Sequence, residues 1–136
     1  MNGKQELREI KNSKILIDSD IIIDHLRGYG YLEKLIDNML QNTCLVSVIS
    51  ISEIYSLLYL NEIEMVEKLL STLKAVNIDS AIARLAGSYR MKYYKSHNLL
   101  IPDALIAASV KISGAILVTK NIKHFPMTDI DKIKPY

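Results

Sequence analysis

Residues 101–119 read IPDALIAASVKISGAILVT, and this stretch decides the fold class. Pro102 suits the first turn of a helix and Gly114 suits its C-terminal end, so residues 101–114 are expected to form one helix. The run AILVT that follows is typical of a strand buried on both faces. A helix joined by a short turn to a buried strand is one half of a parallel β-α-β unit.

Similar apolar runs alternate with helical segments along the rest of the chain. Strands are expected at residues 14–18 (KILID), 43–48 (TCLVSV) and 74–79 (KAVNID). Helices are expected at residues 21–28, 31–40, 50–60 and 62–73, and from Asp79 or Ser80 to about Lys95. Loop with at most one short edge strand is expected after Thr119. This alternation predicts an α/β fold with a parallel sheet of four or five strands and helices on both faces.

Composition indicates one globular domain. The chain has 136 residues, of which 49% are hydrophobic and 24% charged, a range typical of folded proteins. We expect a polar lead-in at residues 1–13 and a single domain at residues 14–136. The single cysteine, Cys44, excludes an intramolecular disulfide framework and a cysteine-rich zinc site. With no signal peptide and no long apolar run, the chain is expected to be cytoplasmic and without a membrane span.

Polar side chains fall where the predicted strands end. Asp18 ends the first strand, Glu53 is expected in the first turn of the helix after the second strand, and Asp103 lies in the first turn of the helix before the fourth. Asn121 directly follows the fourth strand. Because parallel strands end at one common edge of the sheet, these four side chains are expected to meet there.

Each of these residues also has a purely structural interpretation. Asp18 or Asp20 could cap the first helix, Ser50 and Glu53 fit a capping box, and Asp103 would stabilise a helix N-terminus. Crowded carboxylates repel one another unless a cation lies between them. Oxygen ligands without a thiolate favour Mg²⁺ or Mn²⁺ over Zn²⁺, and such an ion suits phosphodiester hydrolysis.

Four motifs in register resemble the PIN-domain family, most closely its VapC-type toxins. They are ILIDSDIIIDHLRG (15–28), SVISISEI (47–54), IPDALIAA (101–108) and ILVTKNIKHF (116–125). The resemblance implies a three-layer α/β/α sandwich and a metal-dependent endoribonuclease, the toxin of a type II toxin–antitoxin pair. It also implies an RNA substrate, with tRNA as one candidate, a cognate VapB-like antitoxin and a homodimer.

The resemblance assigns roles position by position. Asp18, Glu53 and Asp103 match the three acidic metal-site positions of the family, and Thr119 matches a hydroxyl that orients a ligand or the water. Asn121 stands where many members have a fourth acid, and its amide brings no charge. This departure favours one tightly held ion and leaves a second ion open. Asp20 is interpreted as a supporting or capping residue.

Two basic segments are candidate RNA contacts. In the segment YRMKYYKSH (89–97), Tyr89 and Tyr93 are expected in the core, whereas Arg90, Tyr94 and His97 share another face that could contact phosphate and stack on a base. Further candidates, beside the proposed site, are Lys120, Lys123 and His124. Ordinary solvated surface is the alternative for both segments, and the net charge of +2 does not by itself indicate nucleic-acid binding.

Two other functions fit parts of the pattern. A PIN-like module that binds RNA or protein without cutting is one, because Asn121 replaces an acid. A receiver-type phosphoacceptor domain is the other, and the residues that can be matched to it are Asp18, Asp20, Asp79, Thr119 and Lys134. The receiver interpretation leaves Glu53 and Asp103 unexplained and requires Asp79 to be an accessible phosphoacceptor.

Overall fold

A computed structural model describes residues 9–29 and 40–136. Its strands are β1 (Lys14–Ile17), β2 (Thr43–Ser47), β3 (Lys74–Val76), β4 (Ile116–Val118) and β5 (Asp131–Ile133). Its α-helices are α2 (Ser19–Leu26), α4 (Val48–Leu57), α5 (Ile63–Leu70), α6 (Ser80–His97) and α7 (Ile101–Ser113), with 3-10 turns η1 (Leu60–Glu62) and η2 (Ile122–His124). None of the helices in this part of the chain is long and apolar enough to cross a membrane.

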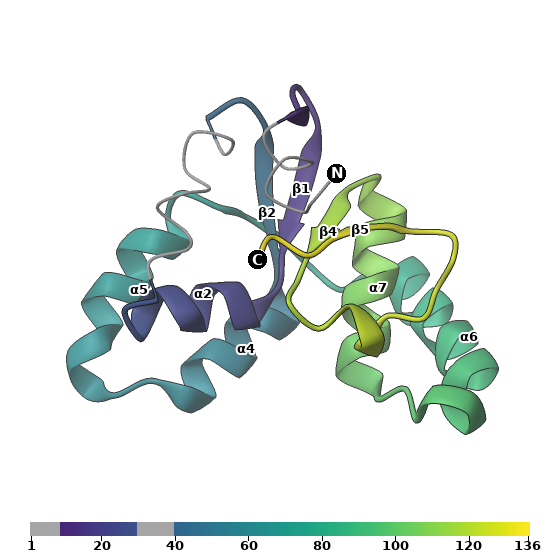
Figure 1. The fold of residues 1–136 in the computed structure, drawn as a ribbon. Coiled ribbons are helices and arrows are strands. Elements are labelled where there is room, and N and C mark those ends of the chain that lie inside the picture. Colours follow the sequence, from purple (N-terminus) through teal and green to yellow (C-terminus); the bar gives the residue numbers. More distant parts are fainter. Residues whose placement is uncertain (1–8, 30–39) are drawn as a thin grey trace.

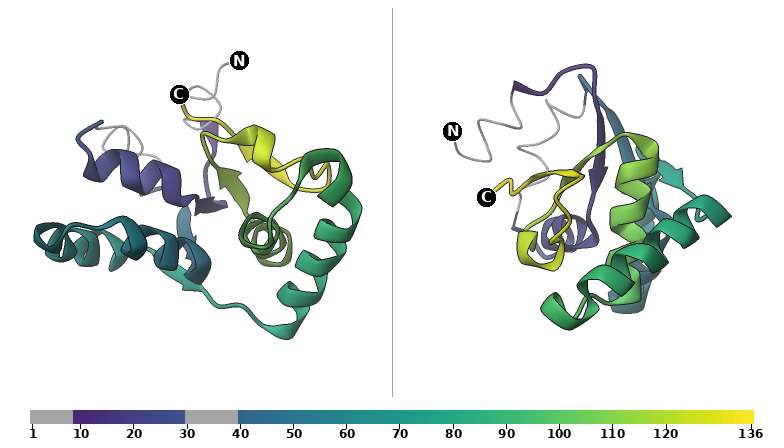
Figure 2. Two further views of the ribbon diagram at one scale, coloured as in Figure 1. Left: turned by 90° about the horizontal axis from the view of Figure 1, so that it is seen from below. Right: turned by 90° about the vertical axis from the view of Figure 1, so that its right-hand side faces the viewer.

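The five strands form one parallel sheet in the order β3-β2-β1-β4-β5. Helices α2, α4 and α5 lie on one side of this sheet and helices α6 and α7 on the other (Figure 1; Figure 2). The predicted three-layer α/β/α sandwich with a parallel sheet is therefore confirmed. β5 is the short edge strand expected after Thr119.

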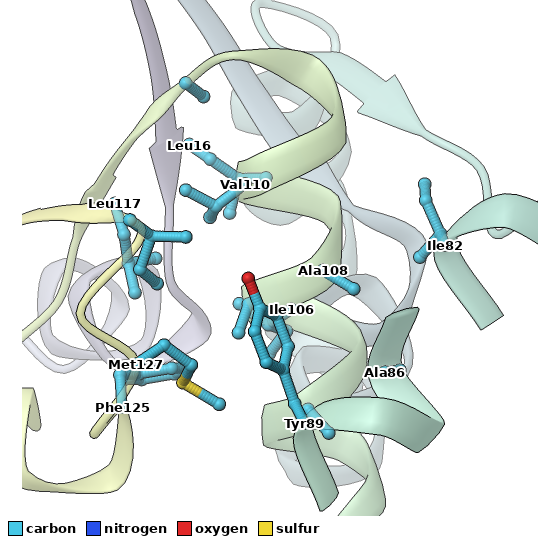
Figure 3. Packing of buried hydrophobic residues seen from close by; sticks show 14 of the residues in the cluster. Leu16, Ile82, Ala86, Tyr89, Ile106, Ala108, Val110, Leu117, Phe125 and Met127 are labelled. Carbon is cyan, nitrogen blue, oxygen red and sulfur yellow. The ribbon is translucent and has the colours of Figure 1, made fainter. Parts of the chain in front are cut away.

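Each helical layer packs its own hydrophobic core against the sheet. On the α6–α7 side, Tyr89 of α6 and Ile106 of α7 are buried together with Phe125 and Met127 of the following loop (Figure 3). The Tyr89 hydroxyl donates to both carboxylate oxygens of Asp129 at 2.9 Å. The core on the other side joins β1 and β2 to α2, α4 and α5. Tyr89 is thus a core residue, as predicted, with its polar end satisfied.

The start of α4 differs from the prediction. The helix begins at Val48, and its N-cap is Ser47, whose Oγ accepts a hydrogen bond from the Ile49 amide at 3.1 Å. Ser47 performs this role because it is the last residue of β2 and keeps an extended backbone. The expected capping box of Ser50 and Glu53 is therefore wrong. Glu53 lies in the second turn of α4, and Ser50 is buried inside the helix.

Most other helix ends follow the predicted signals. Asp79 caps α6, with Oδ1 accepting from the Ile82 amide at 2.9 Å. Gly114 ends α7 in the left-handed conformation, with φ 66°, which a glycine adopts without steric cost. α6 extends to His97, slightly beyond the predicted end near Lys95. The helix predicted at residues 31–40 and most of the lead-in fall outside the described residues.

Candidate active site

The site lies where β1 and β4 end side by side. β1 is the central strand, and the chain continues from it to β2 and β3 on one flank and later to β4 and β5 on the other. The Asp18 amide donates to the Val118 carbonyl at 3.0 Å, which places the residues after the two strands level with each other. In parallel sheets, the crevice at this reversal of strand order is the usual ligand site.

Asp18 is held rigidly at this reversal point. It is the N-cap of α2, and its Oδ1 accepts from the Ser19 amide at 2.8 Å. Its Oδ2 accepts from the Thr119 hydroxyl at 2.8 Å. Only 6% of Asp18 is exposed, and burial, followed by the nearby charge of Asp20, raises its pKa to about 7. The carboxylate is therefore costly to ionise without a cation.

Asp20 is fixed through one of its two oxygens. Its Oδ2 accepts from the Lys120 amide and the Asn121 side-chain amide, both at 3.0 Å, and from the Thr119 hydroxyl at 3.3 Å. Its Oδ1 is buried and has no hydrogen-bond partner among the described residues. Burial raises the pKa of Asp20. An oriented carboxylate with one unpaired, buried oxygen is suited to binding a cation.

Glu53 and Asp103 complete a group of four carboxylates. Glu53 Oε1 accepts a long hydrogen bond of 3.5 Å from the Ser19 hydroxyl. Its pKa is raised by burial and then by the charge of Asp103. The pKa of Asp103 is also raised by burial, and the charge of His124, whose Nδ1 lies 3.7 Å from Asp103 Oδ2, opposes this shift. The pKa values of Asp18, Glu53 and Asp103 are therefore each raised in part by the charge of at least one other carboxylate.

The donor set fits a hard divalent cation in its chemistry. All four acidic groups offer oxygen, and one buried oxygen of Asp20 has no other partner. In the described ranges, however, no three His, Cys, Asp or Glu side chains are arranged closely enough to hold a metal ion. An ion would therefore have to draw the carboxylates together from their present positions.

The structure brings together the residues predicted for this site. Asp18 accepts from Thr119, and Asp20 accepts from both Thr119 and Asn121. The charge of Glu53 also raises the pKa of Asp18, and the charge of Asp103 raises the pKa of Glu53. The structural alternative for Asp18, a helix cap, is observed, because its carboxylate caps α2.

The basic candidates divide into three groups. The Lys120 ammonium lies 2.5 Å from Asp24 and 5.9 Å from the centre of the Tyr136 ring, so it is already paired. Lys123 and His124 are exposed on η2, beside Asp103. Arg90 and Tyr94 lie on α6, on a separate surface.

Sequence reasoning missed two supporting groups. Ser19 contacts Glu53, and the only signal for it was its place between two aspartates. Asp24 accepts from the Tyr136 hydroxyl at 2.6 Å and pairs with Lys120, a role that the sequence alone did not assign to it. No local pattern links residues 24 and 136, because the contact depends on the position of β5.

A parallel α/β sandwich with four partly buried carboxylates at the reversal of strand order defines a protein built around an acidic edge of its sheet. The sequence matches the PIN domain over residues 15–130, and the chain belongs to this family. The resemblance seen in the sequence motifs is thereby confirmed.

Named relatives cover nearly the whole chain. Ribonuclease VapC10 of Mycobacterium tuberculosis is 34% identical over 123 residues, which is 89% of this chain and 91% of that protein. Ribonuclease VapC19 of the same organism is 31% identical over 115 residues, or 82% and 92% of the two chains. A solved toxin-antitoxin complex from Klebsiella pneumoniae contains a chain that matches with a TM-score of 0.74 and 26% identity, covering 90% of this chain and 98% of that one.

Proposed function

We propose that this protein is a Mg²⁺- or Mn²⁺-dependent endoribonuclease and the toxin of a type II toxin–antitoxin pair. The observation that carries the proposal is the grouping of Asp18, Asp20, Glu53 and Asp103 along the β1–β4 edge, each with a raised pKa. Two relatives named as VapC ribonucleases support the reaction class. RNA as substrate places the action in the cytoplasm.

Asp18, Glu53 and Asp103 would hold the ion. When bound, the ion neutralises charge on the phosphate and lowers the pKa of a water molecule. The chain's own groups position the carboxylates: Thr119 donates to Asp18, and Ser19 donates to Glu53. The exposed Lys123 and His124 are placed to contact phosphates that flank the scissile bond.

Asp20 would supply the fourth carboxylate in place of residue 121. Asn121 donates its side-chain amide to Asp20, which an aspartate at position 121 could not do. The Asp20 Oδ1 then remains available to the ion, directly or through water. The amide at position 121 is in this way compatible with an active enzyme.

RNA cleavage with and without metal tests the proposal. We expect cleavage of a single-stranded RNA in Mg²⁺ or Mn²⁺, loss of cleavage in EDTA, and loss in Asp18→Asn and Asp103→Asn. Asp131→Asn on the edge strand is the matched control and should cleave like the wild type. Cleavage that survives EDTA or both site substitutions refutes the mechanism. RNA binding without cleavage in either metal would establish the non-cutting PIN-like module instead.

An exposed apolar surface marks the side proposed for the antitoxin. It spans α4, η1 and α5 and comprises Tyr55, Leu57, Tyr59, Leu60, Ile63 and Met65. Exposed large apolar side chains in one stretch of the chain are candidates for a protein interface, and the Klebsiella pneumoniae neighbour is a toxin-antitoxin complex. We propose a VapB-like antitoxin as partner and a homodimer as the assembly. Light scattering of the protein alone tests the dimer, and inhibition of cleavage by the co-expressed partner tests the antitoxin.

A further inference from the structure

A pocket outside the carboxylate cluster lies on α6 and the start of α7. Its volume is about 440 Å³, and it is lined by Gly87, Arg90, Met91, Tyr94, Lys95 and Ile101. Small-molecule sites in proteins commonly occupy 300–1,000 Å³, so the pocket is large enough for a single organic group. None of its lining residues belongs to the site described above.

A stacked cation and aromatic ring form one wall of this pocket. The Arg90 guanidinium carbon lies 4.5 Å from the centre of the Tyr94 ring. Tyr94 is 49% exposed, whereas the Arg90 Nε is buried and has no hydrogen-bond partner among the described residues. A half-exposed ring backed by a guanidinium offers a stacking surface.

The charge of α6 is strongly one-sided. Between Ser80 and His97 the helix has Arg84, Arg90, Lys92 and Lys95 but no Asp or Glu. The chain contains 17 Lys and Arg and 15 Asp and Glu, so the residues outside α6 carry 13 positive charges against 15 negative ones. None of the four α6 cations takes part in an ion pair within the described residues. The pocket therefore opens on an uncompensated positive surface.

We propose that this pocket binds an unpaired nucleotide of the RNA substrate, with the base against Tyr94 and Arg90 and the adjoining phosphate at Lys95. Unstacked bases bind on aromatic rings and arginine planes, and lysines neutralise the backbone. A second copy docking through the same helix would bring two sets of four cations together, which costs free energy. The proposal rests on RNA being the substrate.

The position of the pocket suits a substrate that also reaches the carboxylates. Ile101 lines the pocket, and Asp103 lies in the same first turn of α7. The two residues flank this turn on different sides, and a helix with its side chains is ~10–12 Å wide. A single RNA strand crossing the start of α7 can therefore occupy both positions at once.

Binding of a short fluorescein-labelled single-stranded oligoribonucleotide, measured by anisotropy in EDTA, tests the proposal without requiring cleavage. Because one base stack contributes about 1–3 kcal/mol, Tyr94→Ala should raise Kd by about 5- to 150-fold, and Tyr94→Phe should restore most of the affinity. Gly87→Leu should also weaken binding: a Cβ at Gly87 meets no atom within 4 Å, so the larger side chain enters the pocket without a clash.

Matched substitutions on the other helical layer provide the controls. Tyr29→Ala, just after α2, and Lys68→Gln on α5 remove an exposed ring and an exposed cation there and should leave Kd unchanged. Arg90→Gln and Lys95→Gln should each lower the slope of log Kd against the logarithm of salt concentration by about one, the amount expected when one phosphate contact is lost. Circular dichroism of each variant checks that it is folded.

The outcomes separate this inference from the proposed function. If the wild type cleaves RNA and Tyr94→Ala binds the oligonucleotide as tightly as the wild type, the pocket proposal is overturned and the nuclease stands. If the Tyr94 and Arg90 variants change the molecular mass in solution and leave Kd unchanged, the surface is a protein interface and the proposal is again wrong. If the wild type neither binds nor cleaves RNA in any metal, the proposed function itself fails.

Discussion

The two helical layers of this protein differ in charge and in what they bring to the candidate active site. The stretch from Val48 to Leu70, which includes α4 and α5, contains four Glu and one Lys, whereas α6 contains four cations and no acid. The side of α2, α4 and α5 supplies Asp18, Asp20 and Glu53, and α7 on the opposite side supplies Asp103. The net charge of +2 is thus the sum of two opposed surfaces, and it conceals both the acidic edge and the basic helix.

The strongest test of this comparison removes one acid from each layer. We expect Glu53→Gln and Asp103→Asn each to lower kcat/KM for RNA cleavage by about a hundredfold or more, because both carboxylates are proposed to hold the same ion. Groups that act as a unit give non-additive losses, so the double variant should be little worse than either single one. Cleavage kinetics on a short RNA measure this, with the exposed Glu64→Gln as control. Losses that multiply in the double variant would show two independent sites.

A second test compares the two hydrophobic cores. Ile54 on one side of the sheet and Ile106 on the other are both completely buried. Ile54→Ala and Ile106→Ala should each lower the free energy of unfolding by about 2–5 kcal/mol, through lost burial and the cavity left behind. Urea unfolding should show one shared transition, and the half-exposed Ile112→Ala should change it little. Two separate transitions would mean that the layers unfold independently.

The third test uses the pH dependence of the acidic layer. Folded Asp18 holds its proton up to a pKa of about 7, and the unfolded residue loses it near 4. Between these values the folded state binds more protons, so the free energy of unfolding of the metal-free protein falls as pH rises from 5 to 8. The raised pKa values of Asp20, Glu53 and Asp103 act in the same direction. The contribution of Asp18 is at most about 4 kcal/mol.

Urea unfolding in EDTA at pH 5, 6.5 and 8 measures this trend. Asp18→Asn should remove most of the slope and stabilise the protein at pH 8, although it abolishes the proposed activity. Mg²⁺ or Mn²⁺ should flatten the slope of the wild type, and Asp131→Asn should keep it. A free energy of unfolding that rises with pH in EDTA would contradict the raised pKa values of these buried carboxylates.

Local patterns predicted the elements well, because burial and capping depend on neighbouring residues. Pro102 and Gly114 predicted α7, and Asp79 predicted the start of α6. The start of α4 was misplaced because two serines, Ser47 and Ser50, both suit a cap, and only the length of β2 decides between them. Asp79 caps α6 and is nevertheless exposed, so the match to the PIN domain over residues 15–130, and not the burial of Asp79, argues against a receiver domain.

The common edge of a parallel sheet was sufficient to predict that Asp18, Glu53 and Asp103 lie along the same edge, near enough for their charges to interact. The order of the strands was not predictable, because it depends on which strand pairs with β1 across the whole chain. The contact of Asn121 with Asp20 and the pairing of Lys120 with Asp24 both follow from β4 lying next to β1. These contacts decide which polar groups remain available at the site.

The pairing of β1 with β4 also sets when the site can form during synthesis. Thr119 reaches Asp18 across 101 residues of sequence, so a ribosome has made most of the chain before the two can meet. Nascent domains fold as units once their long-range contacts are available. A chain from which β4 has not yet emerged, or one truncated before β4, has no assembled carboxylate edge.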